Sequence, residues 1–217
     1  MSPPTITPHT GANNRERGGP SPPTRQQLTA AEREFLKQGK WNKADLTIVD
    51  LGEGAVVVKD FANKNWWIRL LGRLQISRER RAYRRLRGIP GIPEFIGRID
   101  AHALVMQMIP GRQLGFMPDL AKGGDAKLSQ LRRIIDRMHA AGVVHWDLRA
   151  RQNVLITDDG ELYVIDFASA IWLRPGGLAH RLIFKRLTWV DESAYLKWKG
   201  ILEAGPYSDE EQAFLRR

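Results

Sequence analysis

The amino-acid sequence predicts an α+β fold in two lobes, with a small antiparallel sheet in the first lobe and helices in the second. In the first half of the chain, short apolar runs rich in β-branched residues lie between glycine-containing turns. In the second half, apolar residues recur at the spacing of a helix. The chain has 217 residues, enough for one fold of two small lobes, and strands followed by helices are typical of the α+β class.

Three segments are predicted along the chain. Residues 1–30 hold six of the twelve prolines and few apolar residues, so they are predicted to be a disordered leader. Residues 31–109 are assigned to the first lobe and residues 110–217 to the second lobe, which is expected to be truncated after the triplet at residues 166–168.

Each lobe has its own predicted elements. The first lobe is predicted to contain, in order, strands 44–51 and 55–61 joined by a glycine turn, a helix or amphipathic connector over 64–74, a helix over 77–87, and strands 94–99 and 102–109. The second lobe is predicted to contain helix 126–141, strands 154–157 and 162–167, and a basic helical remainder.

Composition excludes several classes of protein. There is no cysteine, so disulfide frameworks and thiolate metal sites are excluded. No apolar run reaches the roughly 18 residues of a membrane span, and the start of the chain lacks the apolar core of a secretory signal. We therefore expect a cytoplasmic protein, with peripheral attachment to the inner face of the membrane as an open alternative.

The net charge of +10 is unevenly distributed along the chain. Residues 64–87 hold nine lysines and arginines, and Glu79 is the only acidic residue among them. Such a surface could meet nucleic acid, anionic lipid or a phosphorylated sugar. It could equally be the solvated face of a helix in a basic protein, and composition leaves both interpretations open.

Lys59 lies in a predicted strand and shares one face of that strand with the apolar Phe61. A buried ammonium group needs an anionic partner. Glu79 is the candidate, because it lies on the same helical stripe as Tyr83 and therefore on the apolar side of its helix. The sequence predicts a Lys59–Glu79 pair that positions the ammonium for nucleotide phosphates. The alternatives are an edge-strand lysine that reaches solvent and a local pair of Glu79 with a neighbouring arginine.

The segment 145–167 carries the remaining polar candidates. Asp147 could accept or orient the proton of an attacking hydroxyl, and Arg149 could neutralise charge on a transferring phosphate. Asn153 offers a neutral oxygen and Asp166 an anionic one, and Mg²⁺ takes one or two carboxylates together with phosphates and waters. Singly, each aspartate could be a cap or turn residue. Together with the lysine–glutamate pair, they indicate phosphoryl transfer.

Across roughly residues 40–170 the sequence resembles protein-kinase-like phosphotransferases. The segments that carry the resemblance are the strand lysine in Val57-Val58-Lys59 with Glu79 as its helix partner, the strand 104–108 that leads into a hinge, the helix end and catalytic loop 138–149, and the triplet Asp166-Phe167-Ala168. Within that superfamily the chain is most similar to small bacterial kinases, including lipopolysaccharide core sugar kinases and the RIO-type serine/threonine kinase group. The resemblance implies a two-lobed protein-kinase-like fold.

The resemblance also implies chemistry and partners. It implies ATP and Mg²⁺ as cofactors, makes Asp147 the catalytic base, and places adenine against a hinge formed by Gln107, Met108 and Ile109. The γ-phosphate would pass to a hydroxyl group of an anionic glycolipid or of a protein serine or threonine. The absence of an Ala-Pro-Glu segment favours a sugar, lipid or small-molecule acceptor. An anionic membrane surface is a further expected partner, whereas nucleic acid is not.

Several residues depart from the family pattern. Trp146 stands where an arginine usually pairs with a phosphorylated activation segment, so that switch is not expected. Ala168 replaces the usual glycine of the triplet. A phosphate-covering loop, if present, is expected near Gly39. These departures favour, as an alternative, a nucleotide-binding pseudokinase with a regulatory role. A further alternative is a basic protein that binds nucleic acid or membrane surfaces.

Overall fold

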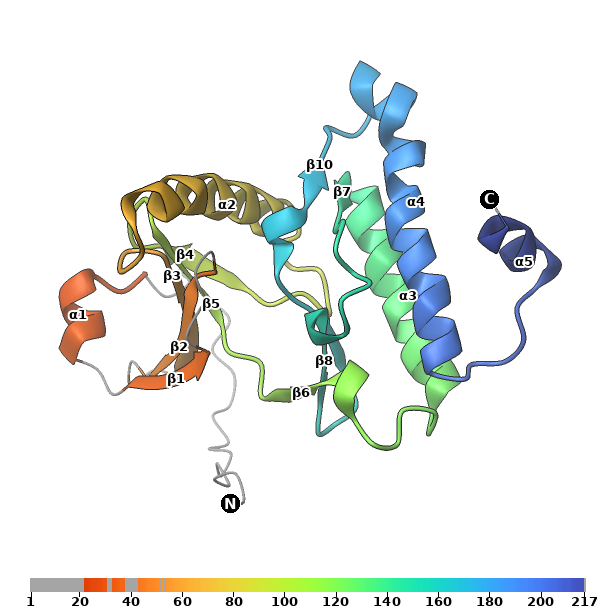
Figure 1. Ribbon diagram of the computed structural model, residues 1–217, viewed down its shortest axis with the longest axis horizontal. Coiled ribbons are helices and arrows are strands. Elements are labelled where there is room, and N and C mark those ends of the chain that lie inside the picture. The colour runs from red at the N-terminus through yellow and green to blue at the C-terminus, as the bar shows by residue number, and fades with distance from the viewer. Residues whose placement is uncertain (1–21, 31–32, 38–42, 51, 53, 217) are drawn as a thin grey trace.

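A five-stranded antiparallel sheet forms the first lobe (Figure 1). Its strands run in the spatial order β1 (Arg33–Lys37), β2 (Asp45–Asp50), β3 (Ala55–Asp60), β5 (Ala103–Gln107) and β4 (Phe95–Arg98). The structure, a computed structural model, describes residues 22–30, 33–37, 43–50, 52 and 54–216. The predicted hairpin is present as β2 and β3, which pair with Lys59 opposite Leu46.

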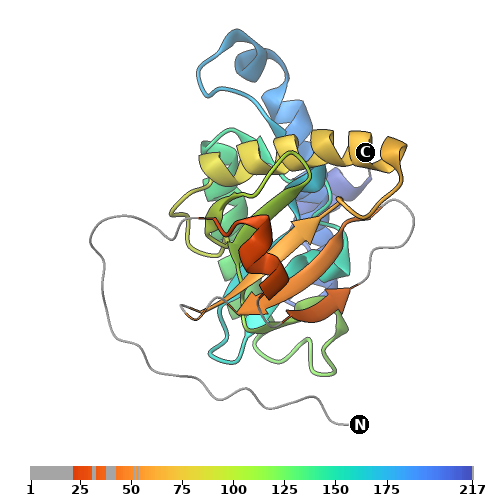
Figure 2. The ribbon, with the colours of Figure 1, turned by 90° about the vertical axis from the view of Figure 1, so that its left-hand side faces the viewer.

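The two faces of this sheet are covered by different helices. Helix α1 (Arg25–Ala30) buries Leu28 against Val58 and Val105 on one face. Helix α2 (Trp66–Arg85) lies across the other face, above the strands in Figure 2, where Phe61 joins the main core. Because side chains alternate along a strand, Lys59 shares the α2 face with Phe61.

Two long antiparallel helices dominate the second lobe (Figure 1). Helices α3 (Gly124–Ala140) and α4 (Leu178–Ile201) pack along each other, and the short helix α5 (Asp209–Leu215) follows with a capping box at Ser208. Beside them lie a three-stranded sheet of β6 (Gly111–Gln113), β8 (Val154–Thr157) and β9 (Leu162–Val164), and the pair β7 (Val143–Val144) with β10 (Ile171–Trp172). The mixed architecture confirms the predicted α+β, kinase-like two-lobed fold. In the described part of the chain, no helix combines the length and apolarity that would let it cross a bilayer.

Two predictions about the first lobe are corrected. Residues 25–30, expected to belong to a disordered leader, form α1, because Leu28 finds an apolar site on the sheet. The two predicted segments 64–74 and 77–87 are one continuous helix, α2. Gly72 does not interrupt it, since an added Cβ would lie 2.5 Å from Phe61 Cγ and the glycine therefore allows close packing on the sheet. Residues 1–21 lie outside the described residues.

Shorter features also differ from the sequence prediction. Strand 162–167 ends at Val164, because Asp166 adopts a left-handed backbone with φ 65° that a strand cannot contain. The short strands β1, β6, β7 and β10 are additions to the predicted set. Gly39, near which a phosphate-covering loop was expected, lies outside the described residues.

Candidate active site

One ammonium group joins the two lobes at the centre of the candidate site. The Lys59 Nζ lies 2.8 Å from Glu79 Oε2 on α2 and 2.9 Å from Asp166 Oδ1 at the end of the β9 segment. The predicted pairing of Lys59 with Glu79 is therefore present, and the alternatives of a solvent-facing lysine and a local arginine pair are wrong. The side chain of Glu79 is fully buried, whereas that of Asp166 is 46% exposed. Of these two carboxylates, only that of Asp166 therefore offers an oxygen atom to the space between the lobes.

The three charges shift one another's protonation. Burial lowers the pKa of Lys59, but the carboxylates of Glu79 and Asp166 outweigh it and hold that pKa above its ordinary value. Burial raises the pKa of Glu79, and the neighbouring ammonium only partly offsets this. Burial also acts to raise the pKa of Asp166, but Lys59 outweighs it and the pKa of this carboxyl stays below its ordinary value. The lysine and Asp166 are therefore both charged at neutral pH.

Tyr83 ties α2 to the segment that carries Asp166. Its ring meets Phe167 edge to face with centroids 5.0 Å apart, and it stacks with Phe95 of β4 at 6.2 Å. Its hydroxyl lies 3.5 Å from Met106 Sδ. Helix α2 is thereby packed simultaneously on the sheet and on the residues after Asp166, which fixes the register of Glu79 relative to Lys59.

Asp147 and Asn153 form a second polar group in the loop after β7. The amide Nδ2 of Asn153 donates to the carbonyl oxygen of Asp147 at 2.9 Å and to its carboxylate Oδ2 at 3.1 Å. The carbonyl of Asn153 accepts from the N–H of Ile165 at 2.9 Å, directly before Asp166. Asn153 therefore connects the Asp147 loop to the Asp166 segment, and it uses its nitrogen toward Asp147.

His145 braces this loop. Its Nε2 lies 3.0 Å from the carbonyl oxygen of Ile165, and its Nδ1 accepts from the N–H of Asp147 at 3.2 Å. The ring also packs on Phe167 with centroids 4.8 Å apart. The imidazole is fully buried, so its contacts are those of a structural residue that holds Asp147 and Asp166 in one frame.

Asp191, on α4, is a site residue that sequence reasoning missed. Its carboxylate is fully buried and accepts from the N–H of His145 at 2.8 Å and from the N–H of Trp146 at 3.1 Å. His139 Nε2 lies 3.0 Å from the same carboxylate. Trp146 has φ 70°, an uncommon conformation for a bulky residue, and the bond to Asp191 holds it there. Trp198 adds a bond from its indole N–H to the carbonyl of Leu148 at 3.0 Å.

Arg149 is not brought together with the other candidates. Its guanidinium donates to Ser193 Oγ on α4 at 3.2 Å, and its carbonyl accepts from Lys197 at 2.8 Å. Within the described ranges it makes no ion pair with Asp147 or Asp166. The structure therefore places Arg149 beside α4, toward a depression of about 410 Å³ that Trp189 also lines.

The predicted hinge connects β5 to β6 and so joins the lobes. The N–H of Gln107 donates to the carbonyl of Glu94 at 2.8 Å, and its side-chain Oε1 accepts from the N–H of Glu94 at 3.0 Å. Gln107 is thus tied to the strand beside it. Met108 is half-buried and Ile109 is buried. These two residues are therefore the apolar part of the segment that was predicted to bind adenine.

The donor set suits a magnesium ion that is shared with a nucleotide. Asp166 provides a half-exposed carboxylate and Asn153 an amide oxygen that its bonds to Asp147 leave unused. Residues 22–30, 33–37, 43–50, 52 and 54–216 contain no group of three or more histidine, aspartate or glutamate side chains that could enclose a metal. Because Mg²⁺ binds proteins through one or two carboxylates plus phosphates and waters, the residues present fit this ion and do not form an all-protein cage.

Comparison with known proteins agrees with this geometry. The RIO domain family model matches residues 55–179, which is more than half of the chain. The match begins with β3, which carries Lys59, and extends past Asp166. A comparison with curated proteins found no match. Lys59, Asp147 and Asp166 all lie inside the matched segment, and the chain belongs to the RIO domain family of atypical, ATP-binding protein kinases.

Proposed function

We propose that this chain transfers the γ-phosphate of ATP, bound with Mg²⁺, to a hydroxyl group. The observation that carries the proposal is the position of Lys59, whose ammonium contacts both the buried Glu79 and the half-exposed Asp166. In that position it is fixed by one carboxylate and available to the α- and β-phosphates beside the other. Adenine would lie against Met108 and Ile109.

The remaining residues would act on the acceptor and on the metal ion. Asp147 would accept the proton of the attacking hydroxyl as its oxygen bonds to the γ-phosphorus and the bond from phosphorus to the β–γ bridging oxygen breaks, releasing ADP. Asn153 holds the Asp147 carboxylate through Nδ2. Asp166 and Asn153 would hold Mg²⁺, which supplies neutralising charge for the phosphates when it is bound.

The acceptor is proposed to be a hydroxyl of a cell-envelope sugar or lipid, or of a protein serine or threonine. Incubating the full chain with γ-labelled ATP and separate glycolipid and protein fractions, followed by mass spectrometry, would identify which fraction gains phosphate. Asp166→Ala should abolish release of the γ-phosphate without changing the unfolding midpoint by more than a few degrees. Asp158→Ala, at an exposed turn aspartate, is the matched control and should retain activity.

Two outcomes would reject this function. Equal turnover by Asp166→Ala and the unmodified chain would show that the site does not act. Nucleotide binding by the unmodified chain, detected as a thermal shift with MgATP but without any phosphate release to either fraction, would identify a pseudokinase with a regulatory role.

A second observation supports an anionic membrane surface as a partner. The first half of α2 exposes five large apolar side chains, namely Trp66, Trp67, Leu70, Leu71 and Leu74. At 100° per residue they fall on one side of the helix, and arginines flank them along α2. An aromatic and leucine face bordered by cations is typical of a helix that lies in a lipid interface. We therefore propose a cytoplasmic protein that attaches peripherally to anionic membranes.

Sedimentation with vesicles tests this attachment. The chain should bind vesicles of phosphatidylglycerol and phosphatidylcholine, and bind pure phosphatidylcholine weakly. The variant Trp66→Ser/Leu70→Ser should lose most of the binding, whereas Phe116→Ser/Leu215→Ser, which removes two exposed apolar residues elsewhere, should not. Equal loss in both variants, or binding that does not depend on anionic lipid, would reject the assignment.

A further inference from the structure

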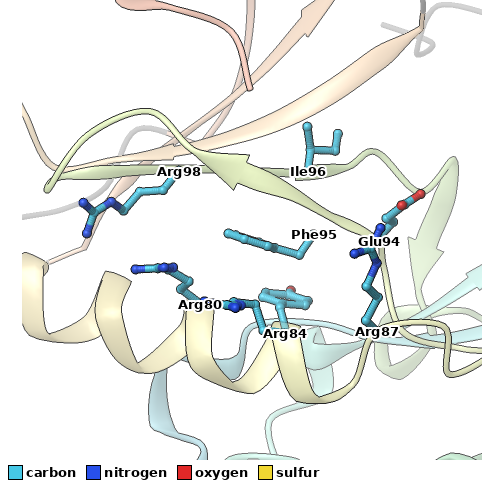
Figure 3. Close-up of a pocket in the computed structure, with 8 residues that line it drawn as sticks. Arg80, Arg84, Arg87, Glu94, Phe95, Ile96 and Arg98 are labelled. Atoms are coloured by element: carbon cyan, nitrogen blue, oxygen red, sulfur yellow. The ribbon is translucent and has the colours of Figure 1, made fainter. Parts of the chain in front are cut away.

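A cavity of about 650 Å³ lies on the first lobe between α2 and β4. Figure 3 shows Arg80 and Arg84 rising from the helix, Arg98 reaching in from the strand, and Phe95 between them. None of the residues proposed to bind ATP or Mg²⁺ lines this cavity. It is therefore a separate site on the first lobe, although α2 forms a wall of both.

The charged side chains that line this cavity are almost all positive. Arg80 and Arg84 lie at i and i+4 on α2, Arg87 follows in the turn directly after the helix, and Arg98 faces them from β4. Glu94 is the only acidic residue in the lining. Like charges at i, i+4 destabilise a helix, so this arrangement costs free energy in the absence of an anion.

Among the described residues, these arginines have no carboxylate partner. In the described part of the chain, none of the four lies within 4.0 Å of a carboxylate oxygen in an ion pair. The contrast with their neighbours on α2 is direct: Arg81 and Arg85 place their guanidinium groups 5.7 Å and 4.4 Å from the ring centre of Trp172. The cavity arginines are therefore distinct from the rest of the basic helix, because their donors remain available to a ligand.

The floor of the cavity is apolar and partly aromatic. Phe95 and Tyr83 both line it, and their rings are stacked with an interplanar angle of 13°. Ile96 borders the cavity, but its side chain points away from Phe95 and packs on the other face of the sheet (Figure 3). A guanidinium group can donate two parallel hydrogen bonds to the oxygens of one phosphate group. The volume of this cavity exceeds the space that one phosphate group needs.

We propose that this cavity binds a small organic polyphosphate, with two or more phosphate groups held by Arg80, Arg84, Arg87 and Arg98. The apolar body of the ligand would rest on the ring of Phe95. Binding at this site requires neither ATP nor catalysis, so this proposal can be tested independently of the proposed transfer reaction.

Calorimetric titration of the full chain with inorganic tripolyphosphate at physiological salt tests the proposal. The variant Arg84→Gln/Arg98→Gln removes one donor from each side of the cavity, and both side chains are exposed, so the fold should survive. The matched control, Arg78→Gln/Arg133→Gln, removes the same charge from two exposed arginines outside the cavity. Unfolding midpoints and MgATP affinity should be the same in both variants.

We expect the cavity variant to bind tripolyphosphate at least about tenfold more weakly than the unmodified chain, because each charge-assisted hydrogen bond to phosphate is worth a factor of this order. The control should change affinity by less than about threefold. Equal weakening in both variants would show diffuse attraction to a basic protein and overturn the proposal. Unchanged affinity in the cavity variant would place the anion elsewhere, and a singly phosphorylated peptide binding as tightly as tripolyphosphate would overturn the ligand class.

Discussion

Replacing Lys59 with methionine would leave the Glu79 carboxylate buried without its cation. The Glu79 side chain is 0% exposed and that of Lys59 is 10% exposed. Removing one partner of such a buried pair costs about 3–5 kcal/mol. Asp166 adds little to this cost, because its side chain is 46% exposed and water screens its charge. We therefore expect Lys59→Met to lower the free energy of unfolding by about 3–5 kcal/mol.

Urea unfolding at pH 7, followed by tryptophan fluorescence, measures this cost. The comparison needs Lys59→Met, Glu79→Gln and the double variant. Because Glu79→Gln removes the uncompensated charge, the double variant should recover most of the stability that Lys59→Met loses. A loss below about 1 kcal/mol for Lys59→Met, or a double variant no more stable than Lys59→Met, would refute the reasoning.

The pH dependence of the stability loss in Lys59→Met is an independent test of the same reasoning. Burial raises the pKa of Glu79 above its ordinary value of 4.5, and Lys59 is the group that opposes this effect. Without Lys59 the folded-state pKa of Glu79 rises further. A group whose pKa is raised by folding contributes stability below its unfolded pKa and loses it as the pH rises through the folded pKa. The deficit of Lys59→Met should therefore be smallest near pH 4–5 and grow toward neutral pH, whereas the double variant should show no such trend.

Three further substitutions, with Gly160→Ala as the control for one of them, test the loop and its supports. Asp191→Asn should lower the free energy of unfolding by about 1–3 kcal/mol, because a buried donor loses its acceptor, and should reduce phosphate transfer while calorimetry shows MgATP binding unchanged; wild-type transfer would contradict this. Asn153→Ala should slow transfer on the order of tenfold to a hundredfold, because the Asp147 carboxylate is no longer held. Single-turnover kinetics measure this rate, and an unchanged rate would contradict the role of that hydrogen bond. Gly142→Ala should cost roughly 2–4 kcal/mol in thermal unfolding, since the residue has φ 74° and an added Cβ would lie 2.1 Å from a backbone oxygen. Gly160→Ala, with φ 84° and no atom within 4 Å of the new Cβ, should cost only about 1–2 kcal/mol, and equal losses would contradict the role of the clash.

Much of the site could be predicted because its residues violate local patterns. Lys59 stands on the apolar face of a strand and Glu79 on the apolar stripe of a helix, so each requires a partner of opposite charge. Asp191 obeys the same rule, since it shares a stripe of α4 with the buried Ala194 and Trp198. The signal for Asp191 was therefore available, but the partners that tie it to the loop are the backbone N–H groups of His145 and Trp146, which no sequence pattern marks.

Other features depend on distant contacts and could not be predicted. Strands β7 and β10 have two residues each, too few for an alternating pattern to be visible. Helix α1 is short and is stabilised by the apolar site that Leu28 fills on the sheet. Arg149 was assigned by its nearness to Asp147 in sequence, but the loop turns its side chain toward Ser193.

The position of Asp191 limits how far the chain can be truncated at its C-terminal end without loss of the loop anchors. The family match ends at residue 179, near the start of α4, yet the carboxylate that holds Trp146 and the indole that holds Leu148 come from beyond that limit. A fragment that stopped at residue 179 would retain Lys59, Asp147 and Asp166 and lose both anchors of the loop. The part of the chain that holds the loop in place thus extends beyond the matched domain, and expression boundaries for this chain should include all of α4.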